Sequence, residues 1–259
     1  MNIYEKSLND LCNKLQITNS DTEYHKFEKL ITVVNQAYLK IALNEFSHIK
    51  TTNQERVISS NFNFLMSLYN KHLREHQVMF LLFNIFETAI RSKAVIELSL
   101  KYSSTKNDDW LHDTSLIPKR MEKPLQEAIK KIIHDGENLT NLDSFEIFDY
   151  ILLGQLQSIY VDFWSDLSHL FQAKTIDGIN FPQIGKRTFE KLFEDIRKSR
   201  NDNAHHKPFH KTRQRRHQII ENTELILIHI GFNLEDAINN IDPQHKIIKL
   251  KYSKRQSDI

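Results

Sequence analysis

The chain has 259 residues, a net charge of +2 and 40% apolar residues, which is enough to build a sizeable core and excludes a disordered chain. With only five Gly and five Pro, the many tight turns of an all-β protein would be hard to supply. The single cysteine, Cys12, excludes an intramolecular disulfide and a structural zinc site made of several thiolates. The composition therefore favours a helical protein.

Apolar stretches are too short or too interrupted to span a bilayer, so we expect no membrane partner. Without a recognisable signal peptide we expect a cytoplasmic location. The charge is uneven: Gln183 to His217 holds eleven Lys or Arg and four Asp or Glu, a local charge of +7, whereas 218–245 has no Lys or Arg. Such a segment suits a polyanion, although a solvated helix face explains the charge equally well.

Apolar residues recur at helical spacing, and no run of strict alternation lies between turn residues, so we expect an all-α fold. The spacing first predicts helices over 4–15, 27–41, 57–69 and 78–100. The last should be the central core helix, because its broad apolar face comprises Val78, Leu81, Leu82, Ile85, Phe86, Ala89 and Ile90.

Turn residues divide the middle of the chain. Residues 103–109 form a polar break, Pro118 and Pro124 mark a helix start, and Asp135-Gly136 ends that helix.

The C-terminal half is predicted to contain a buried apolar segment, a loop and three helices, over 145–170, 178–185, 188–205, 214–230 and 234–241 respectively. Pro208 disfavours helical geometry at the residue before it, so the first of these helices should end near His205. Without internal repeats or a long linker, we expect one domain over 1–259, with a helical core over about 72–242 and an N-terminal helical extension over 1–71.

Polar chemistry is densest at Arg197–Pro208, which reads Arg-Lys-Ser-Arg-Asn-Asp-Asn-Ala-His-His-Lys-Pro. Arg200 precedes His205 by five positions. By itself this is a weak pattern, because about one or two such pairs arise by chance in a chain of this composition.

The surrounding sequence makes the pattern more specific. The stretch Lys191–Pro208 resembles the end of the abortive-infection (Abi-like) family, where a helix of alternating Leu and Arg runs into Arg-Asn, Ala-His-His and Pro. Other blocks resemble that family in the same order, namely Phe86–Arg91, Trp110 with Leu116–Pro118, and Tyr160–Trp164. The ordered set covers about 27–241 of the chain.

The resemblance implies both a fold and an activity. The Abi-like family belongs to the HEPN superfamily, whose all-helical domains often act as metal-independent ribonucleases. We therefore expect an HEPN-type helical bundle that is an endoribonuclease without a cofactor, with Arg200 and His205 as its catalytic pair and Asn201 beside them. The chain departs from the family at Asn203, where a bulky aliphatic residue is expected, and at the loop 183–185.

RNA chemistry is compatible with this assignment, because RNA carries its own nucleophile, the 2′-hydroxyl beside the phosphate. His can accept or donate a proton near neutral pH, and Arg offers a planar fork for phosphate oxygens. On a regular helix Arg200 and His205 would lie roughly 140° apart. Either the helix end near Pro208 redirects His205, or a two-fold dimer assembles one cleft, which the resemblance favours.

Several alternatives stay open. Arg200 could pair with Asp202 or Glu194 while His205 only interacts favourably with the helix C-terminus. A metal site at His205, His206 and His210 is disfavoured, because Asp202 is the only carboxylate nearby.

Two further groups of residues are assigned supporting roles. Glu87 and Arg91, four apart, form either a simple intrahelical ion pair or partners that orient the catalytic pair, and we expect His206 and Asp202 to support the site. The candidates for RNA phosphate binding are Lys207, Lys211, Arg213, Arg215 and Arg216, although an exposed basic face fits them nearly as well. Phe163 and Trp164 are expected in the core rather than as a base-stacking platform.

The expected partners are RNA and a second copy of the chain, and the resemblance adds an antitoxin or a phage-derived trigger in antiviral defence. Two alternatives are a non-catalytic HEPN module that binds RNA or a protein, and an inactive dimerisation scaffold. The presence of both Arg200 and His205 favours the ribonuclease, because a scaffold needs neither.

Overall fold

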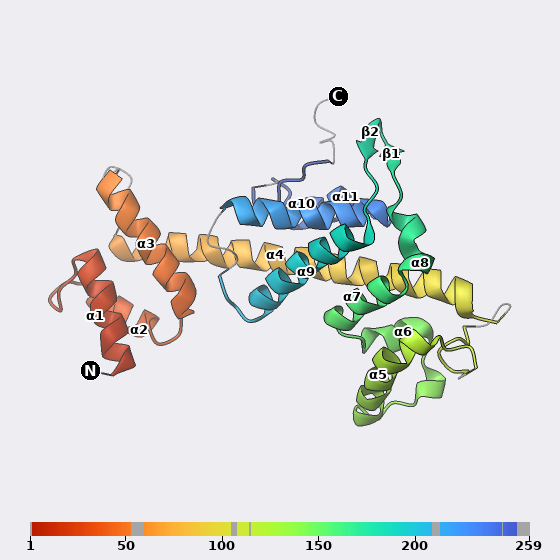
Figure 1. Cartoon of the computed structure of the whole chain (residues 1–259). Coiled ribbons are helices and arrows are strands. Elements are labelled where there is room, and N and C mark those ends of the chain that lie inside the picture. Colours follow the sequence, from red (N-terminus) through yellow and green to blue (C-terminus); the bar gives the residue numbers. More distant parts are fainter. Residues whose placement is uncertain are drawn as a thin grey trace. The chain divides into compact units, whose positions relative to one another are not determined.

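The structure is a computed structural model that describes residues 2–52, 60–104, 108–113, 115–208, 213–244 and 246–252. Helices dominate these residues and confirm the predicted all-α class (Figure 1). The α-helices are α1 (Ile3–Leu15), α2 (Tyr24–Leu30), α3 (Gln36–Thr52), α4 (Asn61–Tyr102), α5 (Glu122–His134), α6 (Ser144–Asp149), α7 (Leu153–Asp162), α8 (Trp164–Leu167), α9 (Lys186–Ala204), α10 (Arg213–His229) and α11 (Leu234–Ile241). The described 3₁₀ helices and strands are η2 (Lys119–Met121), η3 (Leu139–Asn141), η4 (Ser168–Phe171), β1 (Lys174–Ile176) and β2 (Ile179–Phe181).

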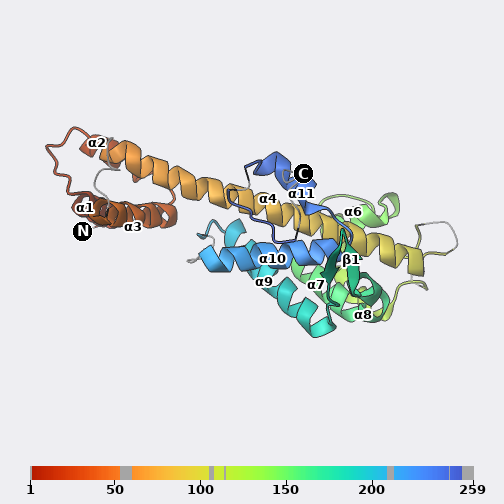
Figure 2. The ribbon, with the colours of Figure 1, turned by 90° about the horizontal axis from the view of Figure 1, so that it is seen from above.

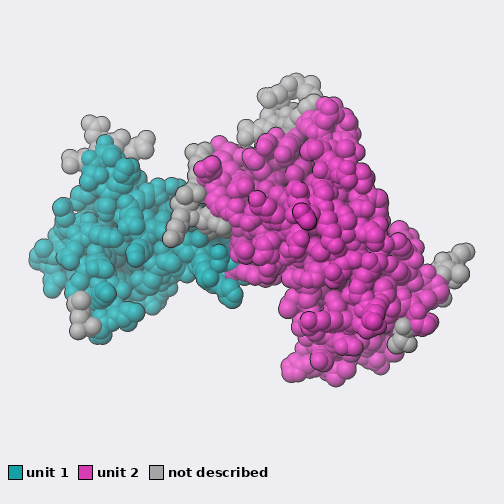
Figure 3. Space-filling model, in the orientation of Figure 1, with its two compact units in different colours: residues 1–79, 202–209 teal, residues 80–201, 210–259 magenta. Residues whose placement is uncertain are grey.

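The chain divides into two compact units, which Figure 3 shows in different colours. Unit 1 comprises residues 1–79 and 202–209, and unit 2 comprises residues 80–201 and 210–259. The helices α4 and α9 therefore contribute residues to both units. The expected N-terminal extension covered residues 1–71. Unit 1 reaches further, to residue 79, and also includes residues 202–209, which the prediction placed in the helical core.

Unit 1 has a hydrophobic core of its own. The side chains of Phe27, Phe46 and Leu65 are completely buried, and their neighbours in the core come from α1, α2, α3 and the first part of α4. Edge-to-face packing joins Phe27 to Phe62, with ring centroids 5.2 Å apart. The N-terminal helices thus bury their apolar faces on one another.

The single helix predicted over 27–41 is wrong, because the chain forms α2 and α3 with a break at 31–35. Asn35 explains the new start: its Oδ1 accepts hydrogen bonds from the backbone N–H groups of Ala37 (3.0 Å) and Tyr38 (3.3 Å). An asparagine that satisfies the first N–H groups of a helix in this way is a strong start signal.

Two predicted helices, 57–69 and 78–100, are parts of the continuous helix α4. Residues 53–59 lie outside the described residues. The polar linking segment 70–77 contains no Gly or Pro, so nothing in it interrupts a helix. The helix ends at Tyr102, directly before the predicted polar break.

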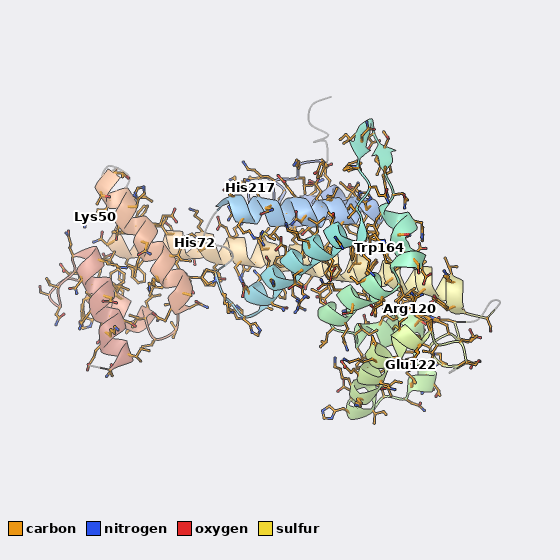
Figure 4. The ribbon with its side chains drawn as sticks, viewed as in Figure 1. Lys50, His72, Arg120, Glu122, Trp164 and His217 are labelled. Carbon is orange, nitrogen blue, oxygen red and sulfur yellow. The ribbon has the colours of Figure 1, made fainter. Side chains whose placement is uncertain are left out.

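The core of unit 2 forms where α9 and α10 lie alongside α4 (Figures 1 and 2). The ring centroids of Phe193 on α9 and Phe86 on α4 are 5.3 Å apart, so these two helices pack on one another. Phe193 and Ile196 are completely buried, whereas Leu192 is only partly buried. Phe163 is completely buried, as expected, whereas Trp164, labelled in Figure 4, is only partly buried, with its ring stacked on Phe171.

A small hairpin corrects the predicted loop over 178–185. Strands β1 and β2 pair in antiparallel fashion with Ile176 opposite Ile179. The two turn residues, Asp177 and Gly178, have φ angles of +50° and +77°. Positive φ at both positions is what a tight two-residue hairpin turn requires. Within the part of the chain that the structure describes, no helix is both long and apolar enough to cross a membrane.

Candidate nucleic-acid site

The helix that carries the Arg200 motif ends as predicted, directly before His205. The backbone N–H of His206 donates to the carbonyl of Asn203, and that of Lys207 donates to the carbonyl of Asp202, each at 2.9 Å. His206 adopts a φ of +52°. This pair of hydrogen bonds around a left-handed residue is a Schellman C-cap, in which His206 takes the position usually held by glycine. His205 therefore lies outside the regular helix, and the 140° separation no longer applies to it.

Arg200 is held by a carboxylate from α4. Its Nη2 donates to Oε2 of Glu87 at 3.0 Å, while the other oxygen, Oε1, accepts from Nη2 of Arg91 at 2.9 Å. The Glu87 side chain is only 13% exposed. The predicted pairing of Glu87 with Arg91 is thus present, and the same carboxylate also orients Arg200.

The alternative partners considered for Arg200 are occupied elsewhere. Glu194 binds Arg197 and Lys198 on its own helix, and Asp202 binds the Nζ of Lys207 at 3.1 Å. The competing assignment of Arg200 to Glu194 or Asp202 is therefore wrong.

Arg200 and Asn201 line a cavity of about 760 Å³ in unit 2. Arg91, Arg120 and Arg197 line it as well, so four arginines border one space. Its floor includes the start of α7, where Gly154 approaches the Arg197 side chain: a Cβ on Gly154 would lie 3.8 Å from Cδ of Arg197. Guanidinium groups and helix N-termini both favour anions.

Carboxylates balance much of this positive charge. Besides Glu87, the cavity is lined by Glu127, Asp149 and Asp162. Arg91 contacts Asp149 at 3.5 Å and donates to the carbonyl of Ile151 at 3.1 Å. The cavity is therefore a network of ion pairs, with arginines fixed in position by their partners.

Two cavity arginines were not among the predicted site residues. Arg197 lies one helical turn before Arg200, and its Nε donates to Gln157 at 2.9 Å and Glu194 at 3.1 Å. The spacing i, i+3 places both side chains on one helix face, so the sequence held a signal for Arg197. Arg120, labelled in Figure 4, is tied to Asp166 and lies over the Phe163 ring; its position, 80 residues earlier in the sequence, left no such signal.

The predicted histidines and Arg200 are assigned to different units. Arg200, Asn201, Glu87 and Arg91 belong to unit 2, whereas Asp202, His205, His206 and Lys207 belong to unit 1. His205 and His206 are exposed. Asn201 lines the cavity with Arg200, as a supporting residue should.

The predicted RNA-binding residues have varied surroundings. Arg215 donates through Nη2 to Oδ1 of Asp195 at 2.7 Å, and Arg216 is partly buried. The Lys207 side chain is exposed and binds Asp202. Lys211 lies outside the described residues, as does the side chain of Arg213.

No group of His, Cys, Asp or Glu residues within the described ranges could hold a metal ion, while His210 falls outside those ranges. Comparisons with protein-family models, curated proteins and solved structures gave no match. The resemblance to the Abi-like family therefore rests on the residues quoted above.

Proposed function

We propose that the chain is a metal-independent endoribonuclease of the HEPN type, with Arg200 and His205 as catalytic residues. The observation that supports this most is the fixing of Arg200 by Glu87 in a cavity lined by four arginines and by Asn201. A phosphate-binding arginine must hold a defined direction, and a carboxylate on a different helix gives it one.

The chemistry follows from the nature of RNA. The 2′-hydroxyl attacks the neighbouring phosphate and the bond from phosphorus to the 5′-oxygen of the next nucleotide breaks. His205 takes the proton of the 2′-hydroxyl or supplies one to the leaving oxygen, while Arg200 stabilises the negative charge of the five-coordinate phosphorus. Glu87 occupies one Nη2 donor of Arg200. A guanidinium has five N–H donors, which leaves others for phosphate oxygens.

For partners we propose RNA, a second copy of the chain, and an antitoxin or phage-derived trigger in antiviral defence. Exposed apolar residues on α4 support the second copy: Phe80, Leu81 and Ile96 keep 44%, 41% and 43% of their surface in contact with solvent. A homodimer would let two copies of Arg200 and His205 form a shared site. Light scattering at micromolar concentration measures this directly, and a monomer would contradict it.

The test of the activity is single-turnover cleavage of labelled RNA in the presence of EDTA. We expect His205→Ala and Arg200→Ala to abolish cleavage, His205→Ala with RNA affinity nearly intact. Arg200→Lys should not restore it, since a point charge lacks the bidentate fork.

Matched controls separate chemistry from surface charge. His134→Ala removes an exposed histidine at the end of α5, and Lys198→Ala removes an exposed cation beside the motif on α9. Both should cleave at the wild-type rate. If folded His205→Ala cleaves as fast as wild type, the catalytic assignment of His205 is wrong. If the wild type binds RNA without cleaving it, the chain is a non-catalytic RNA-binding module instead.

A further inference from the structure

Asn203 is a buried polar residue at the end of the motif helix. Its side chain is completely buried, in unit 1, and its Nδ2 lies 3.0 Å from Nδ1 of His76 and 3.2 Å from the His76 carbonyl oxygen. His76, on α4, is also buried. A buried amide of this kind is costly unless its hydrogen bonds are made.

The geometry fixes which atoms donate. A carbonyl oxygen can only accept, so the Asn203 atom facing the His76 carbonyl is the NH₂ group. That group also faces His76 Nδ1 at 3.0 Å, a contact that becomes a hydrogen bond when Nδ1 is an acceptor and the ring hydrogen lies on Nε2. The hydroxyl of Tyr38 lies 2.7 Å from the same Nδ1 and 3.4 Å from the Lys207 carbonyl. With one hydrogen to donate, Tyr38 gives it to the nearer atom, His76.

The same cluster contacts the turn that follows Asn203. The His206 ring packs on the His76 ring with centroids 5.3 Å apart. Nδ2 of Asn35 donates to the His206 carbonyl at 3.5 Å. The turn therefore meets α4 through His76 and meets the start of α3 through Asn35 and Tyr38.

We propose that His76, Asn203 and Tyr38 are positioning residues that hold the turn carrying His205 and His206, and that a proton on His76 releases this turn. A proton on Nδ1 would place an N–H against the NH₂ of Asn203, so that hydrogen bond would be lost, while the Tyr38 oxygen would become the acceptor and its hydrogen would turn to the Lys207 carbonyl. The role of the turn in catalysis rests on the proposed function. The contacts by which His76, Asn203 and Tyr38 hold the turn, called the hold below, do not depend on that function.

The electrostatic surroundings keep His76 neutral in the folded protein. Burial, reinforced by the neighbouring His206, lowers the pKa of His76. Burial raises the pKa of Tyr38 to about 12, with Tyr69 adding to the effect, so its hydroxyl keeps its hydrogen. The other titratable groups nearby are His72 and Glu75 on α4, Glu45 of α3, which binds His72, and the Asp202–Lys207 pair of the turn.

The sign of the pH effect follows from the direction of this shift. At neutral pH Nδ1 of His76 carries no proton in the folded state, and the turn keeps its contacts with His76. We call this arrangement the closed turn. As pH falls below the ordinary histidine value of about 6.5 and through the lowered pKa of His76, the turn loses the hydrogen bond between Asn203 and Nδ1 of His76. The population of the closed turn should then fall about tenfold for each pH unit.

The test is nuclear magnetic resonance of the full chain with ¹⁵N-labelled histidine, together with amide hydrogen exchange corrected for intrinsic pH dependence. We expect His76 to have its hydrogen on Nε2 at neutral pH and to titrate below the exposed histidines. Protection of the His206 and Lys207 amides should disappear at the same midpoint. A His76 hydrogen on Nδ1, or protection that persists through the His76 titration, would overturn the proposal.

Two variants complete the test. His76→Asn places an amide oxygen near the former Nδ1 position and cannot take up a proton, so the turn should stay protected at low pH. His72→Asn, one turn earlier on α4 (His72 is labelled in Figure 4), removes a titrating group outside the cluster and should behave as wild type. Equal behaviour of the two variants would contradict the assignment to His76.

Cleavage measurements separate this inference from the proposed function. If His205→Ala cleaves normally while the turn still opens with the His76 titration, the catalytic assignment fails and the hold stands. If cleavage needs His205 but the protection of the turn amides does not change with the His76 titration, the hold is wrong and the ribonuclease proposal remains.

Discussion

At the scale of single residues, Glu87 in the candidate site is a carboxylate shared by two guanidinium groups. Arg91 uses one oxygen and Arg200 the other, at 2.9 and 3.0 Å. The three side chains are 17%, 35% and 13% exposed for Arg91, Arg200 and Glu87 respectively. Removing the charge of Glu87 would leave the two partly buried cations of Arg91 and Arg200 close together. Breaking these two ion pairs is therefore costly.

We predict that Glu87→Gln lowers the free energy of unfolding by about 1–3 kcal/mol, because a neutral amide oxygen replaces a carboxylate between two partly buried cations. Urea denaturation followed by circular dichroism measures the change. Glu194→Gln is the matched control on α9, since Glu194 is 31% exposed and binds Arg197 within its own helix; we expect less than about 1 kcal/mol there. Equal losses in both variants would contradict a special role for Glu87.

Sequence reasoning found the components of the site and the Glu87–Arg91 pair, but it did not single out Glu87 as the partner of Arg200. Arg200, Asn201, Glu87 and Arg91 were predicted and line one cavity. The sharing of Glu87 joins residues 113 positions apart, and such pairs depend on how helices pack rather than on any local pattern. The role of Asn203 was missed for the same reason: its departure from the family pattern was visible, but its partner lies on α4.

At the scale of elements, local signals explain which predictions succeeded. The ends of α5, α9 and α11 were predicted within a few residues, because Gly136, Pro208 and the apolar spacing act within one turn. The start of α3 was missed because apolar periodicity continued across the Asn35 cap. The hairpin was missed although Asp177-Gly178 is a strong turn signal, since its strands are three residues each, too short to show an alternating pattern.

A buried carboxylate holds the segment after α11. Asp242 is 1% exposed, and its Oδ2 accepts the backbone N–H groups of Ile247 (2.7 Å) and Ile248 (2.9 Å). Both isoleucines are buried. The carboxylate therefore satisfies two backbone donors that water does not reach.

We predict that Asp242→Ala lowers the free energy of unfolding by about 3 kcal/mol, because two buried N–H groups lose a charged acceptor. Asp236→Ala is the control, since Asp236 is exposed on α11 and its carboxylate accepts only from the side chain of Asn233 among the bonds described for it; the loss of stability in this variant should stay below about 1 kcal/mol. Chemical denaturation of both variants decides the matter, and a stable Asp242→Ala protein would show that Ile247 and Ile248 pack without the carboxylate.

At the scale of the whole molecule, each of the two units has its own buried aromatic residues. Phe46 lies in the core of unit 1 and Phe148 in that of unit 2, and both are completely buried. A side chain buried in one core makes its contacts with that core. Stability in each unit should therefore depend mainly on its own packing, as it does for regions that open separately within one protein.

We predict that Phe46→Ala and Phe148→Ala each destabilise only their own unit. Truncating a buried Phe costs about 3–5 kcal/mol, which should raise the amide exchange rates of the slowest residues in that unit by a factor of about 10²–10³, at 1.4 kcal/mol for each factor of ten. Hydrogen exchange read by mass spectrometry compares α1 and α3 with α5 and α7 in both variants. Phe46→Ala should accelerate exchange in the first pair and leave the second unchanged, with the reverse for Phe148→Ala. If either variant accelerates all four helices equally, the two units unfold as one cooperative body.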